Sequence, residues 1–240
     1  MYLIYGGTGA IGGAIARRLA AEGHPCHLVG RNARALEDAV IALGHGADFT
    51  EGDVTDPALF ERATGTAAKE GHLTGLVYAV GNIRLKPFHR LCASEVEDDF
   101  RLNALGALRA VQAAREPLLA GEGAALFFST VAVAQGFSNH ASIAMAKGAV
   151  EGLTRSLAAE LGPKVRVNAI APSLTVGGMG DKIAAAPKMA DAIARAHPLR
   201  RLGTGEDMAA IAAALLAPGA WITGQVINVD GGRGALRVGD

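Results

Sequence analysis

The sequence is poor in aromatic residues, in cysteine and in net charge. Phe, Tyr and Trp make up 5% of the 240 residues, so the core has to close through aliphatic side chains and close contacts between backbones. The 23 basic and 23 acidic residues cancel, which excludes a strong electrostatic attraction to nucleic acid or to an anionic membrane. Half of the residues are hydrophobic, and this fraction excludes the composition of a disordered protein.

Cysteines and long apolar runs are also scarce. Cys26 and Cys92 lie far apart without other metal ligands around them, a pattern typical of buried thiols in a reducing compartment. No apolar run reaches the roughly 18 residues that a membrane helix needs, and a strand-like run begins at residue 2 in place of a signal peptide. We therefore expect a cytoplasmic protein with no metal, no membrane association and no nucleic-acid partner.

Short apolar runs alternate with longer helical patterns along nearly the whole chain. The runs are almost continuously apolar, as in strands that helices cover on both faces. We expect strands at 2–5, 26–30, 47–50, 76–80, 124–129, 165–170 and 225–229, and helices at 11–21, 33–43, 57–70, 95–119, 142–161 and 206–216. This alternation predicts an α/β fold of the Rossmann type. Its doubly wound parallel sheet has about seven strands, with helices on both faces, in a single domain over 1–240.

A glycine-rich segment connects the first expected strand to the first helix. Gly6, Gly9 and Gly12 have the spacing G-x-x-G-x-x-G at this junction. The first glycine allows a tight turn, the second lets the backbone approach a pyrophosphate, and the third lets the helix pack closely on the strand. The helix N-terminus adds free N–H donors and a favourable dipole. The segment therefore predicts a dinucleotide-binding site.

The end of the second expected strand indicates which dinucleotide is bound. An NAD site usually has a carboxylate here for the ribose 2′-hydroxyl, whereas this chain has Gly30 followed by Arg31. A guanidinium is suited to a 2′-phosphate. We therefore predict NADP(H) as the cofactor.

Later segments complete a pattern that covers nearly the whole chain. They are 53–54 (DV), 102–106 (LNALG), 129–130 (ST), 147–150 (KGAV), 166–172 (RVNAIAP) and 222–232 (ITGQVINVDGG). Together with the glycine loop, they resemble the short-chain dehydrogenase/reductase family, and in particular its 3-oxoacyl-ACP reductases. The resemblance implies a nicotinamide cofactor, a small-molecule substrate and a homo-oligomer, either a dimer or a tetramer.

The resemblance also implies roles for individual side chains. Lys147 would bind the nicotinamide ribose, Thr130 or Ser129 would hold the substrate carbonyl, and Asn103 would help to order a water chain. The residues implied in cofactor binding are Gly6, Gly9, Ile11, Gly12, Arg31, Asn32, Asp53, Val54, Gly81, Lys147, Pro172 and Thr175.

The chain departs from the family pattern at the catalytic tyrosine. That tyrosine belongs four residues before the lysine, and Ile143 occupies the position. An aliphatic side chain cannot act as a general acid, and acid catalysis typically contributes 10²–10⁴-fold to the rate. The family's Asn-Asn-Ala-Gly is also replaced by the segment 78–81 (YAVG), and Ser173 replaces the glycine of its Pro-Gly pair.

Two residues are candidates for the missing proton donor. His140 lies seven residues before Lys147, the spacing of the tyrosine in the enoyl-reductase branch of the family, and its ordinary pKa near 6.5 suits proton transfer. A solvated loop histidine is the competing interpretation, and it is the one we favour. Tyr78 is expected near the nicotinamide half of the cleft, where packing is favoured over proton donation.

Three functions remain open. The first is an NADP(H)-dependent oxidoreductase that acts on a small carbonyl, alcohol or activated alkene, with a substrate lid at about 173–201. The second is a cofactor-binding pseudo-enzyme that serves as a structural or regulatory subunit, and the third is an enoyl-type reductase. We interpret the basic residues of the lid as part of a solvated helix face, in preference to a binding site for an anionic or phosphopantetheine-linked substrate. They are Lys182, Lys188, Arg195, Arg200 and Arg201.

Overall fold

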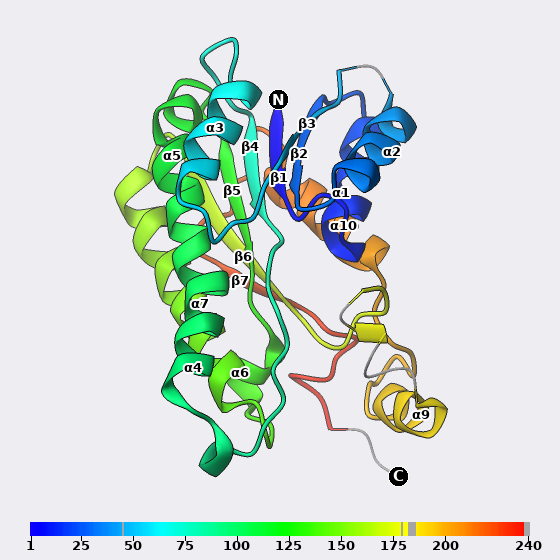
Figure 1. Cartoon of the computed structure of the whole chain (residues 1–240). Coiled ribbons are helices and arrows are strands. Elements are labelled where there is room, and N and C mark those ends of the chain that lie inside the picture. Colours follow the sequence, from blue (N-terminus) through cyan, green and yellow to red (C-terminus); the bar gives the residue numbers. More distant parts are fainter. Residues whose placement is uncertain (45, 179, 182–185, 238–240) are drawn as a thin grey trace.

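Seven parallel strands form one sheet in the order β3-β2-β1-β4-β5-β6-β7 (Figure 1). The computed structural model describes residues 1–44, 46–178, 180–181 and 186–237. The strands are β1 (Tyr2–Tyr5), β2 (Cys26–Gly30), β3 (Asp48–Glu51), β4 (Gly75–Tyr78), β5 (Ala124–Phe128), β6 (Arg166–Pro172) and β7 (Val226–Val229). The strand order reverses between β1 and β4, and a crevice opens beyond the carboxyl ends of the strands at such a switch point.

Helices cover both faces of this sheet. In Figure 1, α3, α5 and α7 lie on one side of the strands, and α1, α2 and α10 lie on the other. The helices are α1 (Ala10–Ala21), α2 (Ala33–Leu43), α3 (Ala58–Ala67), α4 (Ala93–Phe100), α5 (Gly106–Ala120), α6 (Val131–Gln135), α7 (Ala141–Leu161), α9 (Pro187–Arg195) and α10 (Gly205–Leu216). The doubly wound α/β fold predicted from the alternating pattern is thereby confirmed.

Aliphatic side chains close the core on both faces. Neighbouring residues of β1 point to opposite sides, so Leu3 packs in the cluster under α3, α5 and α7, and Ile4 packs under α1, α2 and α10. Alanines of α5 and α10 are fully buried, which lets these helices approach the strands closely. Close packing of small side chains therefore compensates for the scarcity of aromatic residues.

One expected helix, 95–119, is interrupted. A π-helical turn, Arg101–Leu105, separates α4 from α5. The hydroxyl of Tyr78 donates a hydrogen bond to the carbonyl oxygen of Leu102 at 2.8 Å. A Cβ on Gly106 would clash with that hydroxyl, so the glycine makes room for the tyrosine. Helical periodicity alone does not reveal a π turn, because one inserted residue shifts the apolar pattern only slightly.

Short elements near the carboxyl ends of the strands were not expected. They are α6, α9 and a 3₁₀ turn at Phe88–Arg90. Part of the expected lid, residues 179 and 182–185, lies outside the described residues. Within the described part of the chain, no helix is long and apolar enough to cross a membrane, and no three His, Cys, Asp or Glu side chains form a possible metal cluster.

Candidate active site

A cavity of about 870 Å³ lies at the carboxyl ends of the strands. Its walls come from the loops that follow β1 to β6, from α7, from the segment after β6 and from the turn after β7. All but three of the predicted site residues line it, and the exceptions are Gly12, Asn32 and Asn103. Those that do are Gly6, Gly9, Ile11, Arg31, Asp53, Val54, Gly81, Ser129, Thr130, His140, Lys147, Pro172 and Thr175.

The glycine loop forms one end of the cavity. Gly6 has a φ of +79°, a conformation that favours glycine, and its N–H donates to the Val29 carbonyl oxygen at 2.8 Å. A Cβ on Gly12 would clash with the carbonyl oxygen of Gly6, so the helix packs tightly under the turn. No side chain caps α1 at Gly9, and the first-turn N–H groups therefore have no side-chain acceptor. This arrangement suits a pyrophosphate.

Arg31 stands beside the loop at the end of β2. Its side chain is 80% exposed, and its Nη1 is 3.9 Å from Oδ2 of Asp53. An exposed pair at this distance binds weakly, so the guanidinium stays available to a ligand. Asn32 accepts a hydrogen bond from the N–H of Ala35 at 3.0 Å and thus caps α2. A Cβ on Gly30 would lie 3.4 Å from Oγ1 of Thr8, a cavity residue that the sequence analysis missed.

Asp53 is held in its charged form. Hydrogen bonds from the N–H and the hydroxyl of Thr55 lower the pKa of Asp53, and the charge of Arg31 lowers it further. Its carboxylate oxygen Oδ1 accepts both bonds from Thr55, at 2.8 and 2.7 Å. The carboxylate therefore stays ionised at the wall of the cavity.

Lys147 lies at the other end of the cavity, on α7. Its Nζ donates to the carbonyl oxygen of Phe128 at 2.8 Å, and the side chain is only 8% exposed. Burial lowers the pKa of Lys147 to about 8. A Cβ on Gly81 would lie 2.6 Å from Oδ1 of Asn103 and 3.2 Å from this Nζ. Only glycine lets the loop after β4 run between these two groups.

Ile143 lies one helical turn before Lys147 and lines the same cavity. Its side chain is 3% exposed. No tyrosine lines the cavity within the part of the chain that the structure describes, because Tyr2 and Tyr5 are buried in β1. Tyr78 is also buried, which raises the pKa of its hydroxyl, and that hydroxyl is committed to Leu102. No phenol of the described residues is therefore placed to exchange a proton with a ligand.

The two hydroxyl candidates after β5 differ in their partners. Ser129 donates to Oε1 of Glu151 at 2.7 Å, so its proton is committed. Thr130 caps α6 by accepting from the N–H of Ala132 at 3.3 Å. An accepting hydroxyl keeps its own proton to donate. The geometry therefore favours Thr130 over Ser129 as the donor to a substrate oxygen.

Asn103 sits in the π turn behind the cavity wall. Its Nδ2 donates to Oδ1 of Asn82 and to the carbonyl oxygen of Asp99, both at 2.8 Å. Its own Oδ1 is buried and has no partner among the described residues. A buried acceptor without a partner is rare, and it fits a site that a bound water or ligand completes.

A buried carboxylate organises this wall. Asp99 is fully buried and accepts hydrogen bonds from Asn82 Nδ2 and Ser142 Oγ, both at 2.5 Å, and from Nε of Arg84 at 3.2 Å. The bond to Ser142 fixes the start of α7, next to Ile143. The sequence analysis missed this network because Asn82, Asp99 and Ser142 are far apart in the chain and match no motif.

His140 lies at the mouth of the cavity, directly before α7. It is half-buried, its ring Nδ1 is 2.8 Å from the carbonyl oxygen of Ser138, and its ring packs edge-on against Phe137. The carbonyl requires a proton on Nδ1, which leaves Nε2 free for a ligand or solvent.

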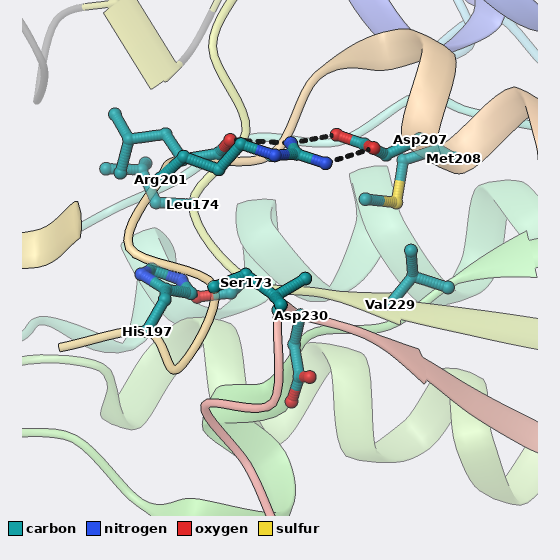
Figure 2. A pocket seen from close by; sticks show the side chains of 12 residues that line it. Ser173, Leu174, His197, Arg201, Asp207, Met208, Val229 and Asp230 are labelled. Carbon is teal, nitrogen blue, oxygen red and sulfur yellow. Dashed lines mark hydrogen bonds and ion pairs between the residues drawn. The ribbon is translucent and has the colours of Figure 1, made fainter. Parts of the chain in front are cut away.

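A second, smaller cavity of about 100 Å³ lies beneath the segment after β6 (Figure 2). His197 is 1% exposed, its Nε2 is 2.8 Å from Ser173 Oγ, and its Nδ1 is 2.7 Å from the Ile193 carbonyl oxygen. Arg201 forms two bonds with the carboxylate of Asp207, at 2.6 and 2.7 Å. These contacts anchor the end of α9 to β6 through Ser173, which lines both cavities.

Comparison with known proteins gives this geometry a context. The family model described as Enoyl-(Acyl carrier protein) reductase matches residues 7–233. A short-chain type dehydrogenase/reductase from Mycobacterium ulcerans is 30% identical, with a TM-score of 0.92 over 100% of this chain and 91% of that chain. A variant of actinorhodin polyketide ketoreductase, solved with NADPH, is 25% identical, with a TM-score of 0.92 over 98% of this chain and 97% of that one.

One curated relative has a name that describes it as inactive. The inactive 2-(S)-hydroxypropyl-CoM dehydrogenase 2 of Xanthobacter autotrophicus (strain ATCC BAA-1158 / Py2) is 34% identical over 233 residues, covering 92% of this chain and all of that protein. The family match spans nearly the whole chain and agrees with the sheet order and the position of the cavity. The chain therefore belongs to the short-chain dehydrogenase/reductase family of oxidoreductases.

Proposed function

We propose that this protein is an NADP(H)-dependent oxidoreductase that acts on a small carbonyl, alcohol or activated alkene. One observation carries the proposal: a single cavity joins the uncapped start of α1 and the guanidinium of Arg31 to Lys147 and Thr130. A helix N-terminus beside the switch point of the sheet is a typical pyrophosphate site, which supports a dinucleotide as the ligand.

The residues present fit the cofactor. The glycine loop leaves room for a pyrophosphate, and the exposed guanidinium of Arg31 is available to a 2′-phosphate. NADPH, when bound, supplies a hydride. The ketoreductase solved with NADPH supports the choice of cofactor.

At the chemical end, the residues of this chain bind and orient the cofactor and the substrate. Lys147 has no carboxylate partner among the residues that the structure describes, so its ammonium is available to ribose hydroxyls, and Thr130 donates to the substrate oxygen. Ile143 excludes water but cannot carry a proton. The proton on the substrate oxygen must therefore come from solvent, or from Nε2 of His140 when both ring nitrogens of that residue carry a proton.

A second candidate function is a cofactor-binding pseudo-enzyme with a structural or regulatory role. Ile143 at the position of the proton donor favours it, and so does the relative whose name describes it as inactive. An enoyl-type reductase is a third candidate, because the matched family model carries that description and His140 lies at the spacing of the tyrosine in the enoyl-reductase branch.

One assay separates the three candidates. NADPH consumption is followed with a panel of small ketones and with enoyl thioesters, for the wild type and for the His140→Ala variant. Ketone turnover supports the first candidate, and its loss in His140→Ala assigns the acid to His140. Turnover of enoyl thioesters alone supports the third. NADPH binding without turnover of any substrate supports the pseudo-enzyme, and absence of NADPH binding contradicts the proposal.

We also propose that residues 1–240 act as a single NADP-binding domain, with a lid at about 173–201, and that the protein is a homo-oligomer. Ala186, Met189 and Ile193 of this segment line the cavity, which supports the proposal of a lid. Light scattering of the full chain distinguishes a dimer from a tetramer, and a monomer contradicts this part of the proposal.

A further inference from the structure

Arg233 brings a cation to the substrate end of the cavity. It lies in the turn after β7 and lines the cavity together with Phe137 and His140. Its Nη1 is buried and has no hydrogen-bond partner among the described residues, and no ion pair to a described carboxylate involves this side chain. A buried charged donor without a partner is costly, so the site is complete only when an acceptor enters.

The backbone around Arg233 is held in place. The Arg233 N–H donates to the Asp230 carbonyl oxygen at 3.2 Å, and the Asp230 carboxylate accepts from the N–H groups of Gly232 and Gly234 at 2.8 and 2.7 Å. The Arg233 carbonyl oxygen accepts from Nε2 of Gln135 at 3.2 Å. The turn is therefore fastened to α6, the helix that Thr130 caps.

The guanidinium is held from one side by an aromatic ring. Its carbon lies 5.0 Å from the ring centroid of Phe137, within the range of a cation–π contact. Phe137 in turn contacts the ring of His140. These contacts orient the guanidinium without neutralising its charge.

The charges on the cavity wall are unequal. Among the described residues that line the cavity, Asp53 is the one carboxylate, and it lies at the nucleotide end beside Arg31. Arg233 faces no carboxylate at the substrate end. The described basic residues of the expected lid do not line the cavity; they are Lys188, Arg195, Arg200 and Arg201.

We propose that Arg233 determines substrate specificity by binding a carboxylate on the substrate, so that the substrate is a small oxo acid or hydroxy acid. A guanidinium binds a planar carboxylate through two parallel N–H groups. Thr130 and Gln135 lie at the two ends of α6, and Gln135 donates to the backbone carbonyl of Arg233, so the same short helix positions Thr130 and the turn that carries Arg233. The inference rests on the proposed function and names its substrate class.

Calorimetric titration tests this assignment independently of turnover. The probes are 4-oxopentanoate and its neutral analogue 4-oxopentanamide, each titrated with and without NADP⁺. The proteins are the wild type, Arg233→Met, Arg233→Lys and the control Arg237→Met, which removes an exposed arginine from the same segment. NADPH binding and the melting temperature of each variant show that it is folded.

We expect the wild type to bind the acid at least tenfold more tightly than the amide. Arg233→Met should lose that difference, Arg233→Lys should keep part of it, and Arg237→Met should keep all of it, with NADPH affinity the same in all four. Equal affinity for acid and amide in the wild type, or unchanged acid binding in Arg233→Met, overturns the inference. Acid binding that depends on Arg233 in a protein that does not bind NADPH supports the inference and overturns the proposed function.

Discussion

The two ends of the cavity are built from different parts of the chain. At the nucleotide end, the proposed binding site consists mostly of backbone groups from the glycine loop and the start of α1, with Arg31 as one side chain. At the chemical end, the proposed function depends on side chains: Lys147, Thr130, Ile143 and Arg233. The glycine loop departs from the family pattern at Ala10, whereas the chemical end lacks the catalytic tyrosine, which Ile143 replaces.

This difference indicates which end of the site tolerates substitutions. A backbone turn depends on glycines whose replacement clashes with neighbouring atoms, so it tolerates few substitutions. A side-chain site can lose one group while the fold stays intact, because Ile143 fills the space in the cavity wall with apolar atoms. Nucleotide binding and chemistry are therefore separable in this molecule, and the predictions below test that separation.

The largest expected effect is a gain of ketone reduction in Ile143→Tyr. A phenol at this position lies one turn from Lys147, whose positive charge lowers the phenol pKa, and general acid catalysis contributes typically 10²–10⁴-fold. The rate of NADPH consumption with small ketones measures the gain. Ile143→Phe is the matched control, because it adds the ring without the hydroxyl. A similar rate in both variants would show that the hydroxyl is irrelevant.

Lys147→Met should make the folded protein more stable at pH 7. Burial lowers the pKa of Lys147 from 10.5 to about 8, which corresponds to a cost of roughly 3 kcal/mol for keeping the charge in the folded state. Loss of the hydrogen bond to the Phe128 carbonyl oxygen lowers the free energy of unfolding by about 1 kcal/mol, which leaves a net stabilisation of about 2 kcal/mol. NADPH affinity should fall at the same time.

The pH dependence of this gain has a definite sign. Between pH 8 and 10.5 the unfolded wild type holds more protons on Lys147 than the folded protein does, so wild-type stability rises with pH there. The gain from Lys147→Met is therefore full below pH 8 and disappears by about pH 10.5. Urea unfolding of both proteins across this range measures it, and a variant that is less stable at pH 7 contradicts the account.

Gly12→Ala should damage the nucleotide end. The new Cβ clashes with the Gly6 carbonyl oxygen, and such overpacking costs about 1–3 kcal/mol. We expect NADPH affinity to fall at least tenfold, measured by fluorescence titration. Gly148→Ala is the control within a helix, since its Cβ would lie 3.8 Å from the nearest neighbouring atom, Cγ1 of Val133, and should be neutral or slightly stabilising. Equal NADPH affinity in both variants would show that the tight packing of Gly12 against Gly6 does not control nucleotide binding.

The smallest expected effect is that of Tyr78→Phe. It removes the hydrogen bond to the Leu102 carbonyl oxygen in the π turn and should lower the free energy of unfolding by about 1 kcal/mol. Thermal unfolding measures this loss. NADPH affinity should stay the same, because Tyr78 does not line the cavity. A lower NADPH affinity in this variant would instead show that the π turn couples the two ends of the site.

Much of the fold and of the nucleotide end could be predicted from the sequence. The seven strands follow from their continuous apolar runs, and the glycine loop follows from its spacing. The π turn could not be predicted, because it depends on a contact between Tyr78 and Leu102, residues that lie far apart in the sequence. The network around Asp99 and the position of Arg233 depend in the same way on how distant loops meet.

The competition between NADPH and NADH for the wild type tests the central claim most directly. The claim is that the nucleotide end is a working NADP(H) site although Ile143 occupies the position of the proton donor. Fluorescence titration should give at least tenfold tighter binding of NADPH than of NADH, and Arg31→Ala should remove most of that preference while leaving NADH binding unchanged. Tighter binding of NADH by the wild type, or binding of neither cofactor, would contradict the account.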